Sequence, residues 1–215
     1  MNDLRVSFLL MTKVPVIGGV KSRLGAEIGE SHAAMLYRCF LLDEVETLDQ
    51  LGEDYIIYYT PEDGRSLLVR LLGDQLYEPQ RGVDLGERLY YGLEMARRLG
   101  YTHGVALASD VPDITVDYLR QVVEALRTRD VVVGLSSDGG YNLIGFRLGL
   151  NSRSFFTDVN WGTQTVFAET MKKLDGYSVD VLPVWSDIDV ASDLSKHRLS
   201  VQSHTYRYLV DNKLI

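Results

Sequence analysis

The sequence predicts an α/β protein built on a mostly parallel sheet, and three observations lead to this expectation. Strand-like apolar runs alternate along the chain with segments whose apolar residues recur every three or four positions. Some of those runs are continuously apolar, as in strands that are covered on both faces. The 215 residues, 46% hydrophobic and 24% charged, contain no linker-like or repetitive stretch. We therefore expect a single domain over residues 1–215, with right-handed crossovers between parallel strands.

The first half of the chain begins with a strand at Val6–Thr12 (VSFLLMT), which has no polar break. Apolar residues at helical spacing predict a long helix over Ser31–Leu51. The β-branched and aromatic run Tyr55–Thr60 predicts a second strand, and a helix over Glu62–Leu72 follows it. A further helix over Leu85–Leu99 has Asp84 as its N-cap and Gly100 as its stop.

The second half continues the alternation. The apolar run Gly104–Ala108 (GVALA) predicts a strand, and Thr115 is expected to cap a helix over Val116–Leu126. Two short apolar runs then predict a pair of strands. The last third is expected to contain a helix, a strand and a helix that starts after Asp189. These remaining segments are strands at Val131–Gly134, Leu143–Phe146 and Val179–Leu182, and a helix over Gln164–Leu174.

Composition excludes several classes of function. A formal net charge of −8 and a pI near 5.0 argue against a broad nucleic-acid surface, so any anionic ligand should be small. The apolar run Val6–Met11 is too short for a signal peptide or a membrane span, and we expect a cytoplasmic protein. The single cysteine, Cys39, has no partner for an internal disulfide and is expected in the core of a helix.

The first polar cluster, KVPVIGGVKSRL, directly follows the first strand. Two adjacent glycines allow backbone N–H groups to approach an anion, and three cations within eleven residues can neutralise a polyphosphate. The alternative is a solvated basic loop, which we rank below phosphate binding. The spacing matches neither a Walker A loop nor a dinucleotide-binding fingerprint. The candidate residues are Lys13, Pro15, Gly18, Gly19, Lys21, Ser22 and Arg23.

The second cluster, Ser109–Asp113, ends the strand at Gly104–Ala108. A carboxylate at a strand terminus, followed by the rigid Pro112, is a suitable oxygen ligand for Mg²⁺. The alternative for Asp110 is a turn cap, and we favour the metal. For Asp113 we accept the structural alternative, a residue that starts the next helix.

Two further clusters are ambiguous by themselves. Asp138–Asn142 (DGGYN) lies between two predicted strands and is also a common hairpin turn. The second of these two is Asp187, Asp189 and Asp193, which precede the last predicted helix. Their only role could be a favourable interaction with the dipole of that helix. Between these clusters, Thr163 is a credible N-cap and Trp161 a credible core or platform residue.

Taken in order, these motifs resemble a known family. The series KVPVIGGVKSRL, DLGERL, ASDVP, DGGYNLIGF, WGT and DIDVASDL is similar to the small prokaryotic glycosyltransferase-like group of the nucleotide-diphospho-sugar transferase (GT-A) superfamily. That group is often associated with radical-SAM selenodomain proteins. The resemblance covers about Val6 to Leu194, and it extends more distantly to 2-phospho-lactate and molybdenum-cofactor guanylyltransferases. It implies a three-layer α/β/α sandwich of the GT-A type.

The resemblance also implies roles for residues. The loop Lys13–Arg23 would bind nucleotide phosphates, with Lys21 and Arg23 acting in catalysis beside Asp110. Asp110 would bind Mg²⁺ or Mn²⁺, and Asp187 or Asp189 could supply a second carboxylate, with Asp189 ranked first. The segment Gln80–Gly86 would line the nucleobase side, through Gln80, Gly82, Asp84 and Gly86. The acceptor side would be shaped by Asp138, Gly139, Gly140, Tyr141, Trp161 and Thr163.

Two departures from the family pattern bear on the reaction. Glycosyltransferases of this superfamily carry an Asp-x-Asp pair, whereas this chain has Asp110 and Asp113 with two residues between them. A single strand-end aspartate is nearer to the nucleotidyltransferase pattern. The group more usually has Cys where Val111 stands and Thr where Ser22 stands, and both changes are mild.

The sequence therefore predicts a metal-dependent transferase that uses a nucleotide or nucleotide-sugar and a small-molecule acceptor. Transfer of a sugar ranks first, and transfer of a nucleotidyl group from a nucleoside triphosphate to a small phosphorylated acceptor is the alternative. A non-catalytic nucleotide-binding protein is the alternative from another class. The tail Ser203–Ile215 is expected to dock on its own domain as a terminal helix or, less often, to pack on a second copy in a homodimer.

Overall fold

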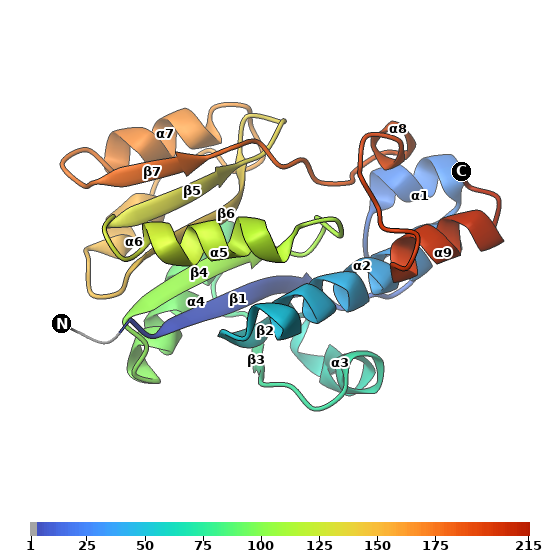
Figure 1. The fold of residues 1–215 in the computed structure, drawn as a ribbon, viewed down its shortest axis with the longest axis horizontal. Helices are drawn as coiled ribbons and strands as arrows, with labels where there is room; N and C mark the ends of the chain where they lie inside the picture. The colour runs from blue at the N-terminus through green and yellow to red at the C-terminus, as the bar shows by residue number, and fades with distance from the viewer. Residues whose placement is uncertain (1–3) are drawn as a thin grey trace.

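The computed structural model describes residues 4–215, so that residues 1–3 of the expected domain lie outside it (Figure 1). Seven strands form one sheet in the order β3-β2-β1-β4-β6-β5-β7. Strand β6 runs antiparallel to both of its neighbours, β4 and β5, and the other pairs are parallel. The strands are β1 (Val6–Lys13), β2 (Asp54–Thr60), β3 (Tyr77–Pro79), β4 (His103–Ala108), β5 (Val131–Leu135), β6 (Tyr141–Arg147) and β7 (Val179–Leu182).

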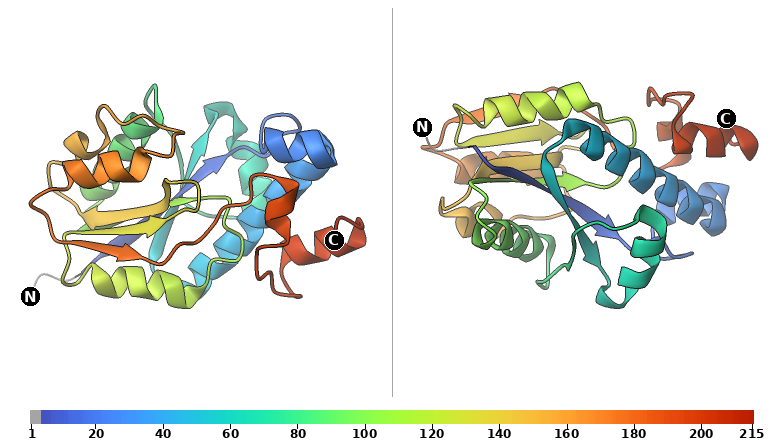
Figure 2. Two further views of the ribbon diagram at one scale, coloured as in Figure 1. Left: turned by 90° about the horizontal axis from the view of Figure 1, so that it is seen from above. Right: turned by 60° about the horizontal axis from the view of Figure 1, so that its bottom comes forward.

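Helices cover both faces of the sheet, which confirms the predicted three-layer sandwich (Figure 2). Apolar side chains of α2, α3 and α5 pack on one face, and those of α4, α6 and α7 pack on the other. Strand β1 contributes to both layers because successive side chains alternate between the faces, with Phe8 on one side and Leu9 on the other. The helices are α1 (Ser22–Ile28), α2 (Glu30–Leu51), α3 (Arg65–Leu72), α4 (Leu85–Arg98), α5 (Val116–Ala125), α6 (Ser152–Phe156), α7 (Val166–Lys173), α8 (Ala191–Leu194) and α9 (His204–Asp211).

Three short elements were not predicted. Helix α1 occupies a segment that the sequence analysis took as loop, and its Gly25 and short length hide the helical pattern. Strand β3 has three residues and α6 has five, too few for a periodicity to be visible. The glycine-rich turn 136–140 reverses the chain between β5 and β6, which accounts for the antiparallel pair within a mostly parallel sheet.

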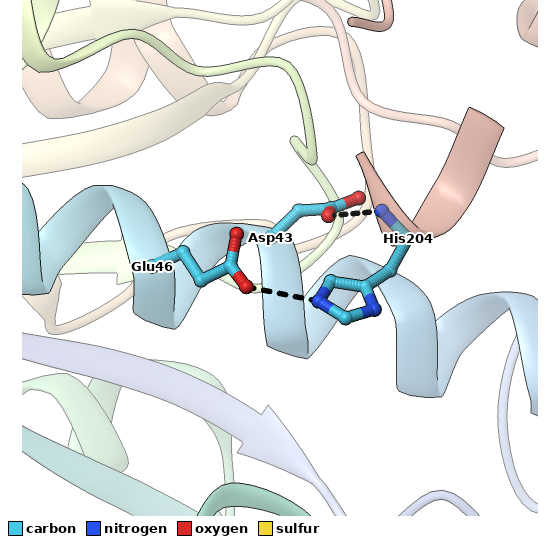
Figure 3. Close-up of side chains that lie close together, drawn as sticks. All are labelled: Asp43, Glu46 and His204. Carbon is cyan, nitrogen blue, oxygen red and sulfur yellow. Dashed lines mark hydrogen bonds and ion pairs between the residues drawn. The ribbon is translucent and has the colours of Figure 1, made fainter. Parts of the chain in front are cut away.

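The C-terminal segment docks on its own chain. Helix α9 packs against α2, as the first interpretation of the tail predicted. The carboxylate of Asp43 on α2 accepts hydrogen bonds from the backbone N–H groups of His204 (2.7 Å) and Thr205 (3.0 Å) at the start of α9. The His204 ring pairs with Glu46 at 2.9 Å (Figure 3). Asp43 therefore satisfies orphan N–H groups at the start of α9.

Asp113 has a different role from the predicted one. Thr115 caps α5, as expected, whereas the Asp113 carboxylate is buried and accepts three hydrogen bonds from the C-terminal part of the chain. The donors are Trp185 Nε1 (2.9 Å), His197 Nδ1 (2.8 Å) and the Arg198 backbone N–H (3.0 Å). Burial acts to raise the pKa of this carboxyl, but these partners outweigh it and hold the pKa below its usual range. Asp113 anchors the segment that follows β7.

No helix within residues 4–215 combines the length and the apolar character that a bilayer crossing requires.

Candidate functional site

A polar cleft opens at the carboxyl ends of β1 and β4, where ligands of open α/β sheets bind. It has a volume of about 440 Å³ and is bounded by the loop after β1, the first turn of α1 and the turn after β4. Three cations of the predicted phosphate loop line it. The lining residues are Met11, Lys13, Val20, Lys21, Ser22, Arg23, Tyr37, Leu85, Ala108, Ser109, Asp110 and Asp189.

Lys21 is the centre of an ion-pair network in this cleft. Its ammonium lies 2.6 Å from Oδ2 of Asp110 and 3.8 Å from Oδ1 of Asp189. The other oxygen of Asp189 pairs with Arg23 at 2.7 Å. The Lys21 side chain is only 7% exposed, whereas that of Arg23 is 76% exposed. The network therefore has a buried cation at its centre and an exposed one at its rim.

Backbone geometry fixes the position of Lys21. It is the residue before α1 and adopts a left-handed conformation (φ 47°, ψ 49°), which is uncommon outside glycine and costs an L-residue roughly 1–2 kcal/mol. Such strain is common at ligand-binding sites. Gly18 also has a positive φ of 73°, while Gly19 packs against Val16 and donates its N–H to the Val16 carbonyl. Arg38 on α2 donates to the Pro15 carbonyl and holds the loop from behind.

Asp187 lies near the same network. Its Oδ1 accepts a hydrogen bond of 2.8 Å from Ser136 Oγ, across from the end of β5. Burial, followed by the negative charge of Asp110, raises the pKa of Asp187 above its ordinary value. The backbone N–H of Ile188 donates to the Asp110 carbonyl at 3.0 Å. The chain after β7 is thus tied to the turn after β4, and this brings Asp187 close enough to Asp110 for their negative charges to repel.

The donor set fits a hard divalent cation. Mg²⁺ prefers carboxylate oxygens and commonly takes one or two of them together with substrate phosphates. Asp110, Asp187 and Asp189 offer such oxygens beside the predicted phosphate loop. Their oxygens do not form a tight cage, since Lys21 lies between Asp110 and Asp189. This arrangement suits an ion that arrives with its nucleotide rather than one held by protein alone.

One group within residues 4–215 places three potential ligand atoms within 4.8 Å of one another, and it lies elsewhere. It consists of Asp43, Glu46 and His204 at the junction of α2 and α9 (Figure 3). Both oxygens of Asp43 already accept backbone N–H groups there. The geometry of this group is explained by the docking of α9.

A buried scaffold that the sequence analysis did not identify holds the turn after β4. Glu44 of α2 is fully buried, and its Oε1 accepts the Val111 N–H at 2.8 Å. Burial raises the pKa of Glu44 well above its ordinary value. Ser109 Oγ donates to the Met11 carbonyl and contacts the Tyr37 hydroxyl at 2.6 Å. The sequence contained a pattern that could have identified Glu44 as a buried residue, because Glu44 falls four residues after Phe40 on the apolar face of the predicted helix.

The predicted nucleobase segment lies beside this cleft, but most of its side chains serve the fold. Gln80 Nε2 donates to the Tyr58 carbonyl at 2.7 Å, and Asp84 caps α4 by accepting from the Glu87 N–H. Gly82 has a φ of 122°, and Gly86 lies so close to the Phe156 carbonyl that a Cβ would come within 2.5 Å of it. Within this segment Leu85 lines the cleft. The two glycines allow the start of α4 to pack closely, Gly82 against Glu87 and Gly86 against Phe156.

The predicted acceptor residues converge on a second cavity of about 250 Å³. Asp138, Tyr141, Trp161 and Thr163 line it, and the Tyr141 and Trp161 rings meet edge to face at 6.2 Å. Gly139 and Gly140 form the turn behind it. A Cβ on Gly139 would lie 2.5 Å from the Gln164 carbonyl, so this turn must carry glycine to pack against the segment before α7.

Comparison with known proteins decides the family. A family profile described as "Uncharacterized protein conserved in bacteria (DUF2064)" matches residues 42–163, more than half of the chain. The chain belongs to the DUF2064 family. The match includes the second half of α2, the turn after β4 with Asp110 and the turn with Asp138, whereas the loop after β1 and Asp189, which also line the cleft, lie outside it.

A similar solved structure covers nearly the whole chain. It comes from a proposed nucleotide-diphospho-sugar transferase of Desulfovibrio desulfuricans G20, with 33% identity, a TM-score of 0.92, and coverage of 98% of this chain and 96% of that one. A cytidylyltransferase from Leptospira borgpetersenii has 14% identity, a TM-score of 0.61 and coverage of 98% and 96%, which shows a shared fold. The predicted superfamily and fold are confirmed.

The chain is also similar to a curated relative that is named for its reaction. The 3-phospho-D-glycerate guanylyltransferase of Phenylobacterium zucineum (strain HLK1) is 29% identical over 137 residues, which are 61% of this chain and 63% of that protein. The match thus spans less than two thirds of that relative's length. The names of all three proteins are those of transferases, the enzyme class that the sequence predicted.

Proposed function

We propose that this DUF2064 protein is a metal-dependent nucleotidyltransferase that joins a nucleoside monophosphate from a nucleoside triphosphate to a small phosphorylated acceptor. The observation that carries the proposal is the convergence of Lys21, from the loop after β1, with the strand-end carboxylate of Asp110. This reverses the order given by the sequence, in which sugar transfer ranked first. The relative named as a guanylyltransferase, at 29% identity, supports the reversal.

The cleft has the charges that such a reaction needs. Lys13, Lys21 and Arg23 would bind the triphosphate, and Lys21, being buried, would act with the least screening. A bound Mg²⁺ or Mn²⁺, held by Asp110 with help from Asp189 or Asp187, would supply further positive charge at the phosphates. An acceptor phosphate oxygen would attack the α-phosphorus, the bond from that phosphorus to the bridging oxygen would break, and pyrophosphate would leave. Lys21 and Arg23 would stabilise the charge that develops on pyrophosphate.

The test is analysis of products. The protein is incubated with GTP, CTP, UTP or ATP, with Mg²⁺ or Mn²⁺ and phosphorylated acceptors. GTP comes first because the curated relative is a guanylyltransferase. Release of pyrophosphate and a mass equal to acceptor plus nucleoside monophosphate is the expected result. Release of a nucleoside diphosphate from a nucleotide-sugar would instead support the sugar-transfer reaction, which the name of the 33%-identical structure favours. Nucleotide binding without either product would support a non-catalytic role.

A further inference from the structure

The cavity beside the cation-lined cleft has a position that suits the body of an acceptor. Its walls come from α4, β4, β6 and the segment before α7. Met11, Leu85 and Ala108 line both the cavity and the cleft, so the two spaces adjoin. A phosphorylated molecule with its phosphate at the cleft can therefore extend its remaining atoms into the cavity.

The chemistry of the cavity is distinct from that of the cleft. Among the residues that line it, none is lysine, arginine or histidine, and the one charged side chain is the carboxylate of Asp138. Oδ1 of Asp138 accepts the Gly140 N–H at 2.9 Å. The other walls are aliphatic or aromatic, with polar groups contributed by Asn142, Thr163, the Tyr141 hydroxyl and the Trp161 indole N–H. The aliphatic residues are Met11, Leu85, Leu89, Ala106, Ala108, Leu143, Ile144 and Val166.

Such a lining penalises an anionic ligand. A carboxylate loses hydration when it enters an apolar cavity, and it regains that free energy only from cations or several hydrogen-bond donors. Proteins commonly recognise carboxylates through the two-pronged guanidinium of arginine, which is absent from this lining. Asp138 would add repulsion between like charges. Under the proposed function, the lysines and arginine of the neighbouring cleft bind the phosphates of the nucleotide and of the acceptor.

We infer that the acceptor is a phosphomonoester whose body carries no negative charge. This inference rests on the proposed function and deepens it. It separates this chain from the curated relative, because 3-phosphoglycerate, named in that relative's activity, has a carboxylate two carbons from its phosphate-bearing carbon. The acceptor site of this chain selects for an uncharged or cationic body.

The experiment compares three acceptors with the same three-carbon chain and the same phosphate: 3-phosphoglycerate, glycerol 3-phosphate and propyl phosphate. Both pyrophosphate release and binding to the protein loaded with a non-hydrolysable nucleoside triphosphate are measured. Glycerol 3-phosphate and propyl phosphate have uncharged bodies, and each is expected to exceed 3-phosphoglycerate by at least about tenfold in kcat/KM or affinity. The reason is that the uncompensated carboxylate of 3-phosphoglycerate opposes binding.

Variants locate the effect in the cavity. Asp138→Asn should reduce the preference in kcat/KM and affinity for glycerol 3-phosphate over 3-phosphoglycerate. Thr163→Arg should reverse this preference because it supplies a cation. Asp158→Asn is the matched control, because Asp158 is an exposed aspartate outside the cavity lining, and its left-handed backbone (φ 55°) accommodates asparagine. The control should keep the parent's preference.

Each contrary outcome overturns the inference. Equal or better use of 3-phosphoglycerate by the parent protein would do so directly. If the nucleotide-loaded protein binds none of the three acceptors, the cavity is not the acceptor site. If Asp138→Asn changes nucleotide affinity when no acceptor is present, the cavity holds the nucleobase. The proposed function is judged separately, because it fails when no nucleoside triphosphate binds or when no acceptor of any charge yields pyrophosphate.

Discussion

The ammonium group of Lys21 lies 2.6 Å from the carboxylate of Asp110, although the two residues are 89 positions apart in the sequence. The parallel pairing of β1 and β4 brings their carboxyl ends together and so creates this contact. The same pair also links the phosphate loop to the proposed metal ligand. Four predictions test the consequences of this arrangement and of the scaffold around it.

Replacing Lys21 by methionine should weaken binding of nucleoside triphosphates far more than binding of the bare nucleoside. A charge-assisted hydrogen bond to phosphate is worth about 1.5–3 kcal/mol, which corresponds to roughly a tenfold to hundredfold loss of affinity. Arg23→Ala should have a smaller effect in the same direction, because its side chain is 76% exposed. Titration calorimetry with nucleoside and triphosphate measures both. Equal losses for the two ligands would show that these side chains do not contact phosphate.

Replacing Asp110 by asparagine should abolish metal-dependent nucleotide binding while the fold persists. Asparagine keeps the size and polarity of aspartate but lacks the charge that attracts a hard cation. Asp189→Asn should show a weaker form of the same loss. Mn²⁺ titration of nucleotide binding, with circular dichroism as a check of folding, gives the comparison. The matched control is Asp117→Asn on α5, where the side chain is 85% exposed and pairs with Arg120. Unchanged metal affinity in a folded Asp110→Asn protein would remove Asp110 from the metal site.

The buried Glu44 should make stability depend on pH. Burial raises its pKa well above the ordinary value of 4.5, so the folded protein holds a proton that the unfolded chain releases. The free energy of unfolding should therefore fall as pH rises above 4.5 toward the raised pKa of Glu44. Glu44→Gln removes this titration and should give a shallower decline between about pH 5 and pH 8, measured by urea unfolding in the presence of a chelator. Asp43 and Asp187, whose pKa values are also raised, would maintain part of the slope.

The control for Glu44 is Glu124→Gln on α5, a site where the side chain is 76% exposed. It should leave the slope of the parent protein unchanged. If Glu44→Gln and the parent protein decline in parallel across this pH range, Glu44 is not protonated in the native state.

Replacing Asp113 by alanine should destabilise the protein by about 1–3 kcal/mol or more, since about 1–3 kcal/mol is the usual cost of leaving a buried hydrogen-bonding group without its partner. The change leaves donors of Trp185 and His197 without their acceptor. The loss should appear in the urea midpoint and in faster proteolysis of the segment after β7. Asp117→Ala is the exposed comparison and should cost little. A midpoint shift no larger than that of Asp117→Ala would mean that Asp113 does not anchor the segment.

Several parts of the site could be predicted before the fold was known. The loop with Lys13, Lys21 and Arg23 was identified because cations and glycines directly follow an apolar strand, a local pattern. Asp110 was identified for the same reason. Glu44 was missed because a single charge on an apolar helix face does not by itself identify its partner. That partner is the Val111 N–H, 67 residues away.

The sequence by itself determined the α/β class, the position of the main strands and helices, and the residue types at the ends of β1 and β4. These features depend on the periodicity of apolar residues and on neighbours along the chain, and both can be read directly from the sequence. The tertiary structure alone decided that Asp113 anchors the C-terminal segment rather than starting α5, and that β6 runs antiparallel. It also decided that the cavity beside the cation-lined cleft has no cation in its lining. The physical reason is that such properties arise when side chains from distant segments are brought together, and only the packed sheet fixes which segments meet.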